Sequence, residues 1–525
     1  MERRLLIAFI LSFALLSAWS AIFPAPKTNE MSKTSQINEI KEDMAIQPSV
    51  VQFLPSKSEE TLSVNVQKEI KILENSKIRA EFSNLGGNLT KLFDKEHDAT
   101  LPATNIFGTA QYNDQMFEVA ELTAESITYV HQGKGGSVAK KYIFSNDDYT
   151  LQAQVEFQGT PDNTDLEAFE LDIGALDKTK INASDNSLFE YFIISEPVYR
   201  KEGAFKFSPN EAKNLSQNIE LVGFRDRYFC IIMRPDFMTD SVRINPADED
   251  TLEIKIRPKT EAGNMAFATT IYFGPQKLGL LKKYKLGFEK AMVFSNWGWL
   301  DALAKGIYSL MHWLYKVVPN WGVCIILISF IIYGAMYPLT LYGMSSMKRM
   351  QTIQPIMNRL REQYKNNPQR LNKEIMELYK EHRVNPLSGC LPLFMQMPVF
   401  VALYQVLWRS VDFKGAHFFW IKDLSHPDRL FILPFSLPML GNEFNLLPFL
   451  MMGIMVVQQK LSAKNMVITD PSQAAQQKMM TMIFPVVLGV IFYKFASGLS
   501  LYFTTFYLMS TLTQWKMSKI RVPAK

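Results

Sequence analysis

The 525-residue sequence has few of the residues that most enzymes use for chemistry. It contains 3 cysteines and 6 histidines, and it has no HExxH zinc motif, no nucleophile elbow and no GxxxxGK[ST] phosphate loop. Cys230, Cys324 and Cys390 form no CxxC pair, and the last two lie in apolar runs. We therefore interpret all three as small packing residues. We expect no catalytic residue, no metal and no cofactor.

Charged residues are absent from five long apolar stretches in the second half of the chain. About 20 apolar residues suffice to cross a hydrocarbon core of about 30 Å as a helix, so we expect five membrane-spanning helices. They cover residues 321–341, 390–408, 444–459, 479–493 and 495–515. The third and fourth are short, and the bilayer is expected to be locally thinner around them.

A sixth uncharged stretch lies near the N-terminus, from Leu5 to Phe23, and follows an Arg-Arg pair. The small residues near its end are compatible with a cleaved signal peptide, but the stretch is longer than the apolar core of most signal peptides. We favour an uncleaved transmembrane anchor over residues 1–23. Residues 24–66 are polar and lack a helical or strand period, which predicts a flexible linker.

From residue 67 to residue 290, apolar residues often alternate with polar ones, as they do in half-buried β-strands. One clear example runs from Leu151 to Phe157, and a second runs from Leu252 to Ile256. Short runs of this kind, separated by Gly- and Asn-containing turns, are typical of antiparallel sandwiches. We predict one all-β sandwich domain over 67–290.

The hydrophobic period changes to three or four residues at about residue 291, where a helix is expected instead. Leu300, Ile307 and Leu314 fall on one face of this helix, and four tryptophans lie in or beside it. Its Asp and Lys residues are too many for a span. Tryptophan favours the membrane–water interface, so 291–319 is predicted to be an amphipathic helix at the membrane surface.

The distribution of charge predicts the topology. Residues 24–295 hold 31 Lys and Arg against 40 Asp and Glu, a net charge of −9. The loop 344–388 holds nine basic and four acidic residues, whereas 409–445 holds four of each. Short loops rich in Lys and Arg stay on the cytoplasmic side of a membrane. We therefore expect both termini and the loop 344–388 in the cytoplasm, and the acidic β domain outside.

The loop 344–388 has a helical period of its own. Apolar residues recur every three or four positions from Met350 to Tyr364, a turn follows before Pro368, and the period resumes from Leu371 to His382. This pattern predicts an antiparallel helical hairpin. It is either a solvated spacer or a docking site for a cytoplasmic partner, such as a ribosome or a targeting factor, and its net charge of +5 favours an RNA-rich partner. The candidate docking residues are Lys348, Arg349, Arg359, Arg361, Lys365, Arg370 and Lys373.

The predicted spans are rich in methionine and contain scattered polar residues. Of the 27 methionines, 18 lie between Met336 and Met517, and flexible thioether side chains adapt to varied apolar partners. A single polar residue in a span usually hydrogen-bonds a neighbouring helix, but a set of them is able to hydrate a groove. The candidate groove residues are Ser329, Tyr333, Gln396, Gln405, Tyr502 and Thr505.

Several motifs resemble, in order along the chain, those of the YidC membrane protein insertases of the YidC/Oxa/Alb family. They cover the region from about 297 to 515 and are highly specific. The motifs are NWG at 320–322, YGAMYPL at 333–339, NPLSGCLP at 385–392, QMPVFVALY at 396–404, TDP at 469–471, FP at 484–485 and SGL at 497–499. The β domain matches more loosely, but its place between the first two spans is that of the Gram-negative members.

This resemblance implies a polytopic α-helical protein of the bacterial inner membrane that inserts and folds nascent membrane proteins, alone or with the Sec translocon. It implies six transmembrane helices, five of them around a hydrophilic groove, and a periplasmic β-supersandwich similar to sugar mutarotases. One position departs from the family. Tyr333 stands where a groove arginine is usual, so the resemblance does not carry over a direct attraction of acidic substrate tails.

Two other functions fit parts of the sequence less well. A secondary transporter or channel would show charged residues at mid-span and an internal repeat, and neither is visible. A membrane-tethered carbohydrate enzyme would need convergent carboxylates and histidines in the β domain. The two histidines there, His97 and His131, belong to no recognisable constellation. We therefore expect an insertase core over 320–525, in contact with lipid and without a small-molecule substrate.

Overall fold

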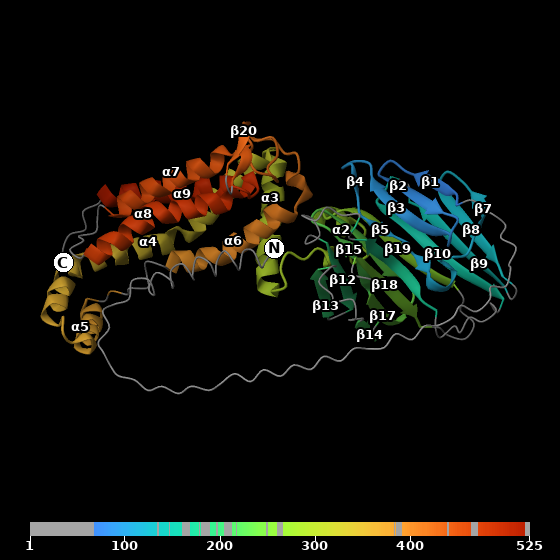
Figure 1. The fold of residues 1–525 in the computed structure, drawn as a ribbon, viewed down its shortest axis with the longest axis horizontal. Helices are drawn as coiled ribbons and strands as arrows, with labels where there is room; N and C mark the ends of the chain where they lie inside the picture. Colours follow the sequence, from blue (N-terminus) through green and yellow to red (C-terminus); the bar gives the residue numbers. More distant parts are fainter. Residues whose placement is uncertain are drawn as a thin grey trace, which may run out of the picture.

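The computed structural model describes residues 68–519 as a β domain followed by a bundle of helices (Figure 1). The predicted anchor at 1–23 and the predicted linker at 24–66 lie outside the described residues. Within 68–519, the segments that are not described are 134–135, 146, 160–168, 178, 180–188, 196–197, 204–212, 217, 248–249, 260–265, 383, 385–390, 438–439 and 464–470.

The β domain consists of short strands whose described pairings are all antiparallel. The strands are β1 (Ile70–Glu74), β2 (Ile78–Ser83), β3 (Asn88–Asp94), β4 (Ala99–Thr100), β5 (Ala103–Thr104), β6 (Gly108–Thr109), β7 (Glu118–Leu122), β8 (Ser126–Gln132), β9 (Gly136–Phe144), β10 (Thr150–Gly159), β11 (Leu171–Asp177), β12 (Glu190–Ser195), β13 (Val198–Gly203), β14 (Lys213–Leu215), β15 (Leu221–Arg225), β16 (Phe229–Pro235), β17 (Thr239–Pro246), β18 (Thr251–Pro258) and β19 (Ala266–Pro275).

These strands form three sheets. The largest has nine strands in the order β13-β12-β15-β16-β19-β10-β9-β8-β7, and a second follows the path β14-β17-β18-β11-β5, with β6 paired to β11. A third contains β1 to β4 in chain order. The alternation that predicted strands is confirmed in β10, where Leu151, Ala153 and Val155 are buried and Gln152 is exposed. One face of this strand therefore packs on the core.

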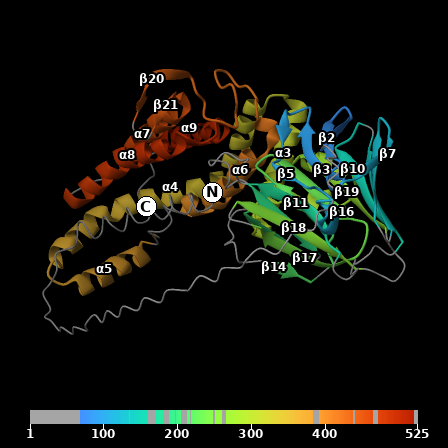
Figure 2. The same cartoon turned by 45° about the vertical axis from the view of Figure 1, so that its right-hand side comes forward.

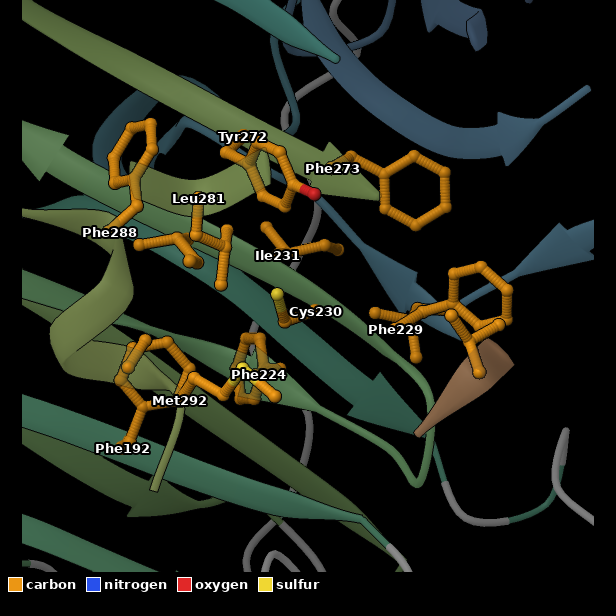
Figure 3. Packing of buried hydrophobic residues seen from close by; sticks show 14 of the residues in the cluster. Phe192, Phe224, Phe229, Cys230, Ile231, Tyr272, Phe273, Leu281, Phe288 and Met292 are labelled. Carbon is orange, nitrogen blue, oxygen red and sulfur yellow. The ribbon is translucent and has the colours of Figure 1, made fainter. Parts of the chain in front are cut away.

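A short helical segment covers part of the nine-stranded sheet. It contains α2 (Leu278–Lys283) and the 3₁₀ turn η5 (Phe288–Ala291). Figure 3 shows its residues Leu281, Phe288 and Met292 packed beside side chains of the sheet, with Cys230 within the same cluster. Burial of these apolar side chains stabilises the domain, and Cys230 is the packing residue that the sequence predicted.

The second region is helical. Its elements are α3 (Gly298–Val317), α4 (Trp321–Gln363), α5 (Pro368–Glu381), α6 (Leu391–Arg409), η7 (Val411–Phe413), β20 (Phe431–Leu437), β21 (Gly441–Phe444), α7 (Leu446–Ala463), α8 (Pro471–Phe492) and α9 (Ser497–Lys519). The helices fall on the five predicted spans, with one correction. Phe444 does not begin a span but ends the hairpin of β20 and β21, because Asp428 Oδ2 accepts hydrogen bonds from Leu446 N and Leu447 N and so begins α7 there.

By length and composition alone, one helical segment within the described residues passes as a membrane span, namely Trp321–Ser346 in α4. Leu446–Leu461 in α7 and Thr481–Phe492 in α8 are shorter apolar segments. Their shortness matches the expectation from the sequence that these two spans are short.

Helix α3 lies at the boundary between the two regions (Figure 1). Leu300, Ile307 and Leu314 are buried, as their spacing predicted. Its opposite side exposes large apolar side chains, including Trp299 and Trp313, each 59% exposed. An amphipathic helix whose free face carries tryptophan suits the edge of a membrane better than bulk water.

The predicted helical hairpin is present at the far end of the bundle from the β domain, where α5 folds back beside α4 (Figure 2). Asn367 accepts a hydrogen bond from Arg370 N and caps α5, and Pro368 is its first residue. Ile353, Met357 and Leu378 are buried between the two helices. The first helix of this hairpin is not separate, because it continues the span from Trp321 without a break.

Candidate functional site

A cavity of about 390 Å³ lies inside the helical bundle. Its walls come from α4, α6, α7, α8 and α9, which are far apart in sequence. The lining side chains are aromatic, aliphatic, thioether, amide or hydroxyl groups, and among the described residues each of them is uncharged. They are Met336, Leu339, Thr340, Gln396, Met397, Phe400, Met455, Gln458, Gln459, Phe484, Leu488, Phe492, Phe503, Phe506, Tyr507 and Ser510.

Two hydrogen-bonded pairs supply the polar part of this cavity. Gln396 Nε2 donates to the hydroxyl of Tyr502 at 2.6 Å and joins α6 to α9. Gln458 Nε2 donates to Ser510 Oγ at 2.7 Å and joins α7 to α9. Both pairs are neutral, so the two side chains of each pair satisfy each other's hydrogen-bonding groups without burying a charge. The cavity is consequently amphipathic, with amides and hydroxyls set among methionine and phenylalanine.

The predicted groove residues only partly meet at this cavity. Gln396 lines it, and Tyr502 lies directly behind as the partner of Gln396. Ser329 and Thr505 are buried, and each donates its hydroxyl hydrogen bond to the carbonyl of the preceding helical turn. Gln405 lies near the end of α6 and accepts a hydrogen bond from Arg409 Nε at 3.3 Å. These last three side chains do not line the cavity.

Tyr333 takes a position behind the cavity wall. Its side chain is only 7% exposed, and its hydroxyl donates to Thr513 Oγ1 at 2.7 Å, which ties α4 to α9. Its ring packs edge-on against Phe506, with 5.4 Å between the ring centroids, and Phe506 lines the cavity. Tyr333 therefore shapes the wall rather than presenting a polar group to the cavity.

Sequence reasoning missed several lining residues. Gln458 and Gln459 end an apolar run in α7, and Thr340 and Ser510 are isolated polar residues on α4 and α9. The only available signal was an uncharged polar residue inside a span. That signal does not show which side of a helix faces a cavity, so it selected Gln405 and left out Gln458.

The predicted docking residues lie on the hairpin of α4 and α5. Arg349, Arg359, Lys365, Arg370 and Lys373 are exposed, Arg361 is half-buried, and Lys348 lies in α4. Arg370 and Lys373 are each within 3.9 Å of a glutamate one turn further along α5. Such exposed pairs contribute little to stability.

The β domain contacts the helical core at the end of α6. The guanidinium of Arg227, between β15 and β16, donates from Nε to Trp408 O at 2.6 Å and from Nη2 to Ser425 O at 3.0 Å. It also lies 3.5 Å from the centroid of the Trp408 ring. The last carbonyls of a helix lack intrahelical partners, and a cation there also opposes the negative end of the helix dipole.

Ion pairs surround this contact. Arg409 at the end of α6 reaches Glu190 of β12 at 3.1 Å, and Glu190 also pairs with the buried Arg225 at 2.7 Å. Nearby, Asp412 contacts His312 at 3.1 Å and Lys277 at 3.6 Å. Burial disfavours ionisation of Asp412, but these partners outweigh burial and hold the pKa of this carboxyl below its usual range.

Among the described residues, no group of three or more His, Cys, Asp or Glu side chains is arranged to hold a metal ion. Together, the geometry shows an uncharged amphipathic cavity in an apolar helical bundle, a basic hairpin at one end and a β domain fixed at the other.

The chain matches known proteins over almost its whole length. A family model described as the 60Kd inner membrane protein matches residues 313–525, and one described as the YidC periplasmic domain matches residues 67–310. The membrane protein insertase YidC of Geobacter metallireducens is 30% identical, with 99% of this chain and 98% of that protein covered. The chain belongs to the YidC membrane protein insertase family. The YidC of Pelobacter propionicus is 31% identical, with 96% of each chain covered.

Solved structures include a crystal structure of an active YidC insertase, which is 21% identical, covers 86% of this chain and 93% of its own, and has a TM-score of 0.38. A galactose mutarotase related enzyme from Lactobacillus acidophilus is 12% identical and covers 39% of this chain and 97% of its own, with a TM-score of 0.28. Membership of the YidC family makes this protein an inner-membrane insertase with nascent membrane proteins as clients and a β-rich periplasmic domain.

Proposed function

We propose that the cavity between α4, α6, α7, α8 and α9 is the passage through which this insertase receives its clients. The observation that carries this proposal is the amphipathic lining itself. An incoming transmembrane segment has an apolar body and a polar flank. The cavity offers methionine and phenylalanine for the first, and Gln396, Gln458 and Ser510 for the second.

The energetic role of the cavity follows from solvation. An apolar segment is stable in lipid without help, but each unsatisfied backbone group of its flank costs several kcal/mol in hydrocarbon. A cavity with exchangeable hydrogen-bond groups lowers that barrier. Because the barrier is one of solvation, we propose that this step needs no nucleotide, metal or covalent chemistry. The client then leaves sideways into lipid over a methionine-rich surface that fits many sequences.

We further propose the finer topology. Six transmembrane helices, including residues 1–23, with both termini in the cytoplasm, place the basic α4–α5 hairpin in the cytoplasm. There it docks a ribosome or targeting factor, and the Sec translocon is a lateral partner. The β domain then lies in the periplasm as a supersandwich built on its nine-stranded and six-stranded sheets, and α3 lies at the outer membrane surface.

The test is site-specific photo-crosslinking from the cavity. A photoreactive residue at Gln396 or Gln458 is expected to capture ribosome-bound nascent membrane proteins. A matched position is Leu508, which is 42% exposed on α9 and does not line the cavity. Capture at the lining positions should exceed capture at Leu508 for membrane clients. Equal capture of soluble nascent chains at Gln396 would contradict the proposal.

Tyr333 offers a second test. Tyr333→Arg places a charge behind the cavity wall, and it is expected to alter insertion mainly for clients with acidic translocated tails. Tyr333→Phe removes only the hydrogen bond to Thr513, so it controls for loss of the tie between α4 and α9. Equal effects of Tyr333→Arg on acidic and neutral tails, measured by protease protection in vesicles, would argue against a role of cavity charge in client choice.

A further inference from the structure

The connection between α6 and α7 carries an exposed apolar hairpin that the cavity does not use. The hairpin consists of β20 and β21, and it stands over the end of α7 in both views (Figures 1 and 2). Leu430, Phe431, Ile432 and Phe435 are 41%, 49%, 63% and 57% exposed. Every residue between Arg429 and Glu443 is uncharged. This is an unusual surface for a chain segment in water.

The exposure follows both faces of the strand. Successive side chains of a strand point to opposite faces, and the pairing with β21 is regular at Phe431 and Ile432, so these two exposed side chains lie on opposite faces of β20. A strand that docks on a protein partner buries one face and keeps polar residues on the other. Apolar side chains on both faces instead indicate an apolar medium on both sides.

The hairpin is continuous with the apolar surface of α7. The ring of Phe431 stacks on Phe444 at a centroid distance of 4.7 Å, and Phe444 stacks on Phe449 at 5.3 Å. Phe449 and its neighbour Leu450 are 40% and 43% exposed on the apolar helix α7. These ring contacts therefore join the exposed apolar surface of α7 to that of the hairpin.

A polar neck marks the other limit of this surface. Arg429 pairs with Glu443 where the two strands meet α7. Tyr493 donates its hydroxyl hydrogen bond to Glu443 O at 2.5 Å, and Asn445 Oδ1 accepts from Arg429 N at 2.9 Å. Charged and amide groups at the base and apolar groups beyond it match the gradient at a membrane surface.

We propose that the β20–β21 hairpin dips into the outer leaflet of the bilayer and anchors the outer ends of α7 and α8 in the lipid headgroup region. The depth is limited by the backbone. Among the described residues of β20, Phe431, Ile432 and Leu437 have cross-strand partners in β21 and the residues between Ile432 and Leu437 do not, and unpaired backbone groups are not tolerated in the hydrocarbon core. The occupant is thus interfacial lipid, and this inference does not depend on the role of the cavity.

The test uses the full-length protein in phosphatidylethanolamine–phosphatidylglycerol vesicles, with Cys230, Cys324 and Cys390 replaced by alanine. A nitroxide is attached to Phe435→Cys, and its collisions with oxygen, which concentrates in lipid, and with a water-soluble nickel chelate are measured. Leu122→Cys is the control for water, because Leu122 is 50% exposed on β7 of the β domain. Val457→Cys is the control for lipid, because Val457 is 51% exposed on α7.

The oxygen-to-nickel collision ratio at Phe435 is expected to be several-fold above that at Leu122 and below that at Val457. A ratio equal to that at Leu122 would show a hairpin in water and overturn the proposal. Loss of collisions with both reagents would show that a polypeptide, such as a second copy or a client, covers the hairpin, and would also overturn it. A ratio equal to that at Val457 would show that Phe435 lies as deep in the lipid as Val457, and would overturn the proposed interfacial position.

Discussion

The β domain and the helical core bury polar groups in different ways. In the β domain, Lys140 is fully buried and donates to Gly86 O at 2.7 Å and Asn88 Oδ1 at 2.6 Å, and Arg225 is held between Glu190 and backbone carbonyls. In the core, the groups around the cavity are neutral amide–hydroxyl pairs. Buried basic side chains with dedicated partners specify one structure. Neutral pairs are exchanged at low cost, which suits the client passage that we propose for this cavity.

The two regions also differ in how tightly their buried side chains are packed. Phe224 in the β domain is fully buried, whereas Phe506 in the core is half-buried and borders the cavity. Phe224→Ala is expected to lower the free energy of unfolding of the β domain by about 3–5 kcal/mol. Phe506→Ala should lower the stability of the core by less than half as much, because its ring already lacks neighbours on one side. Pulse proteolysis of the full-length protein in detergent measures both, and equal losses would remove this contrast.

The contact between the two regions depends on Arg227. Arg227→Met removes its hydrogen bonds to Trp408 O and Ser425 O, and the expected cost to the contact is about 1.5–3 kcal/mol, as for other hydrogen bonds of charged groups. Distances between nitroxides at Leu122 and Val457 should then spread. Arg234→Met, on β16 with an exposed guanidinium, is the matched control. An unchanged distance distribution for Arg227→Met would show that other contacts are sufficient to hold the two regions together.

The buried charge of the β domain should make its stability depend on pH. Burial lowers the pKa of Lys140 to about 7, from an ordinary value of 10.5. Above pH 7 the folded side chain is neutral while the unfolded one still binds a proton, so stability should rise with pH between about 7 and 10.5, by up to about 1.4 kcal/mol per pH unit.

Urea unfolding of the full-length protein at pH 6, 7, 8 and 9 measures this slope. Lys140→Met should abolish it, whereas Lys141→Met, on the opposite face of β9, should retain it. If the wild-type protein shows the same stability at all four pH values, the Lys140 ammonium is fully compensated in the folded state.

The smallest effect is expected for a neutral pair in the core. Gln458→Leu removes the hydrogen bond to Ser510, and such interhelical bonds are worth about 0.6 kcal/mol on average. Insertion should nevertheless fall for clients with a polar flank and stay unchanged for apolar ones. A double-mutant cycle with Ser510→Ala separates the contribution of this hydrogen bond to stability from the effect of the changed cavity lining on insertion. A loss of stability as large as that from Phe224→Ala would contradict the view that these pairs are exchangeable.

Local features of this fold were predictable from the sequence. Alternation identified β10 and β18, the three-to-four period identified α3 and α5, and Pro368 marked the turn of the hairpin. These signals depend only on residues close together in sequence, so they are visible without knowledge of the tertiary contacts. The start of α7 at Leu446 was not visible, because Phe444 and Asn445 are uncharged like the span that follows them.

The cavity was less predictable than the helices that form it. Its walls come from five helices, and the rotation of these helices depends on contacts between residues far apart in sequence, such as Gln396 with Tyr502 and Tyr333 with Thr513. Polarity within a span singled out Gln396 correctly as a lining residue. It could not distinguish Gln405, which accepts a hydrogen bond from Arg409, from Gln458, which lines the cavity.

The unbroken helix α4 has a mechanical consequence. Its 43 residues form a rod of about 65 Å at a rise of about 1.5 Å per residue, and this rod extends from the β-domain end of the bundle to the basic hairpin. The rod contains two prolines that interrupt its backbone hydrogen bonding, Pro338 beside the lining residues Met336 and Thr340 and Pro355 within the hairpin, and a helix bends most easily at proline. A force on the hairpin is therefore expected to bend α4 at Pro355 and at Pro338, and the second bend would move the wall of the cavity that we propose as the client passage.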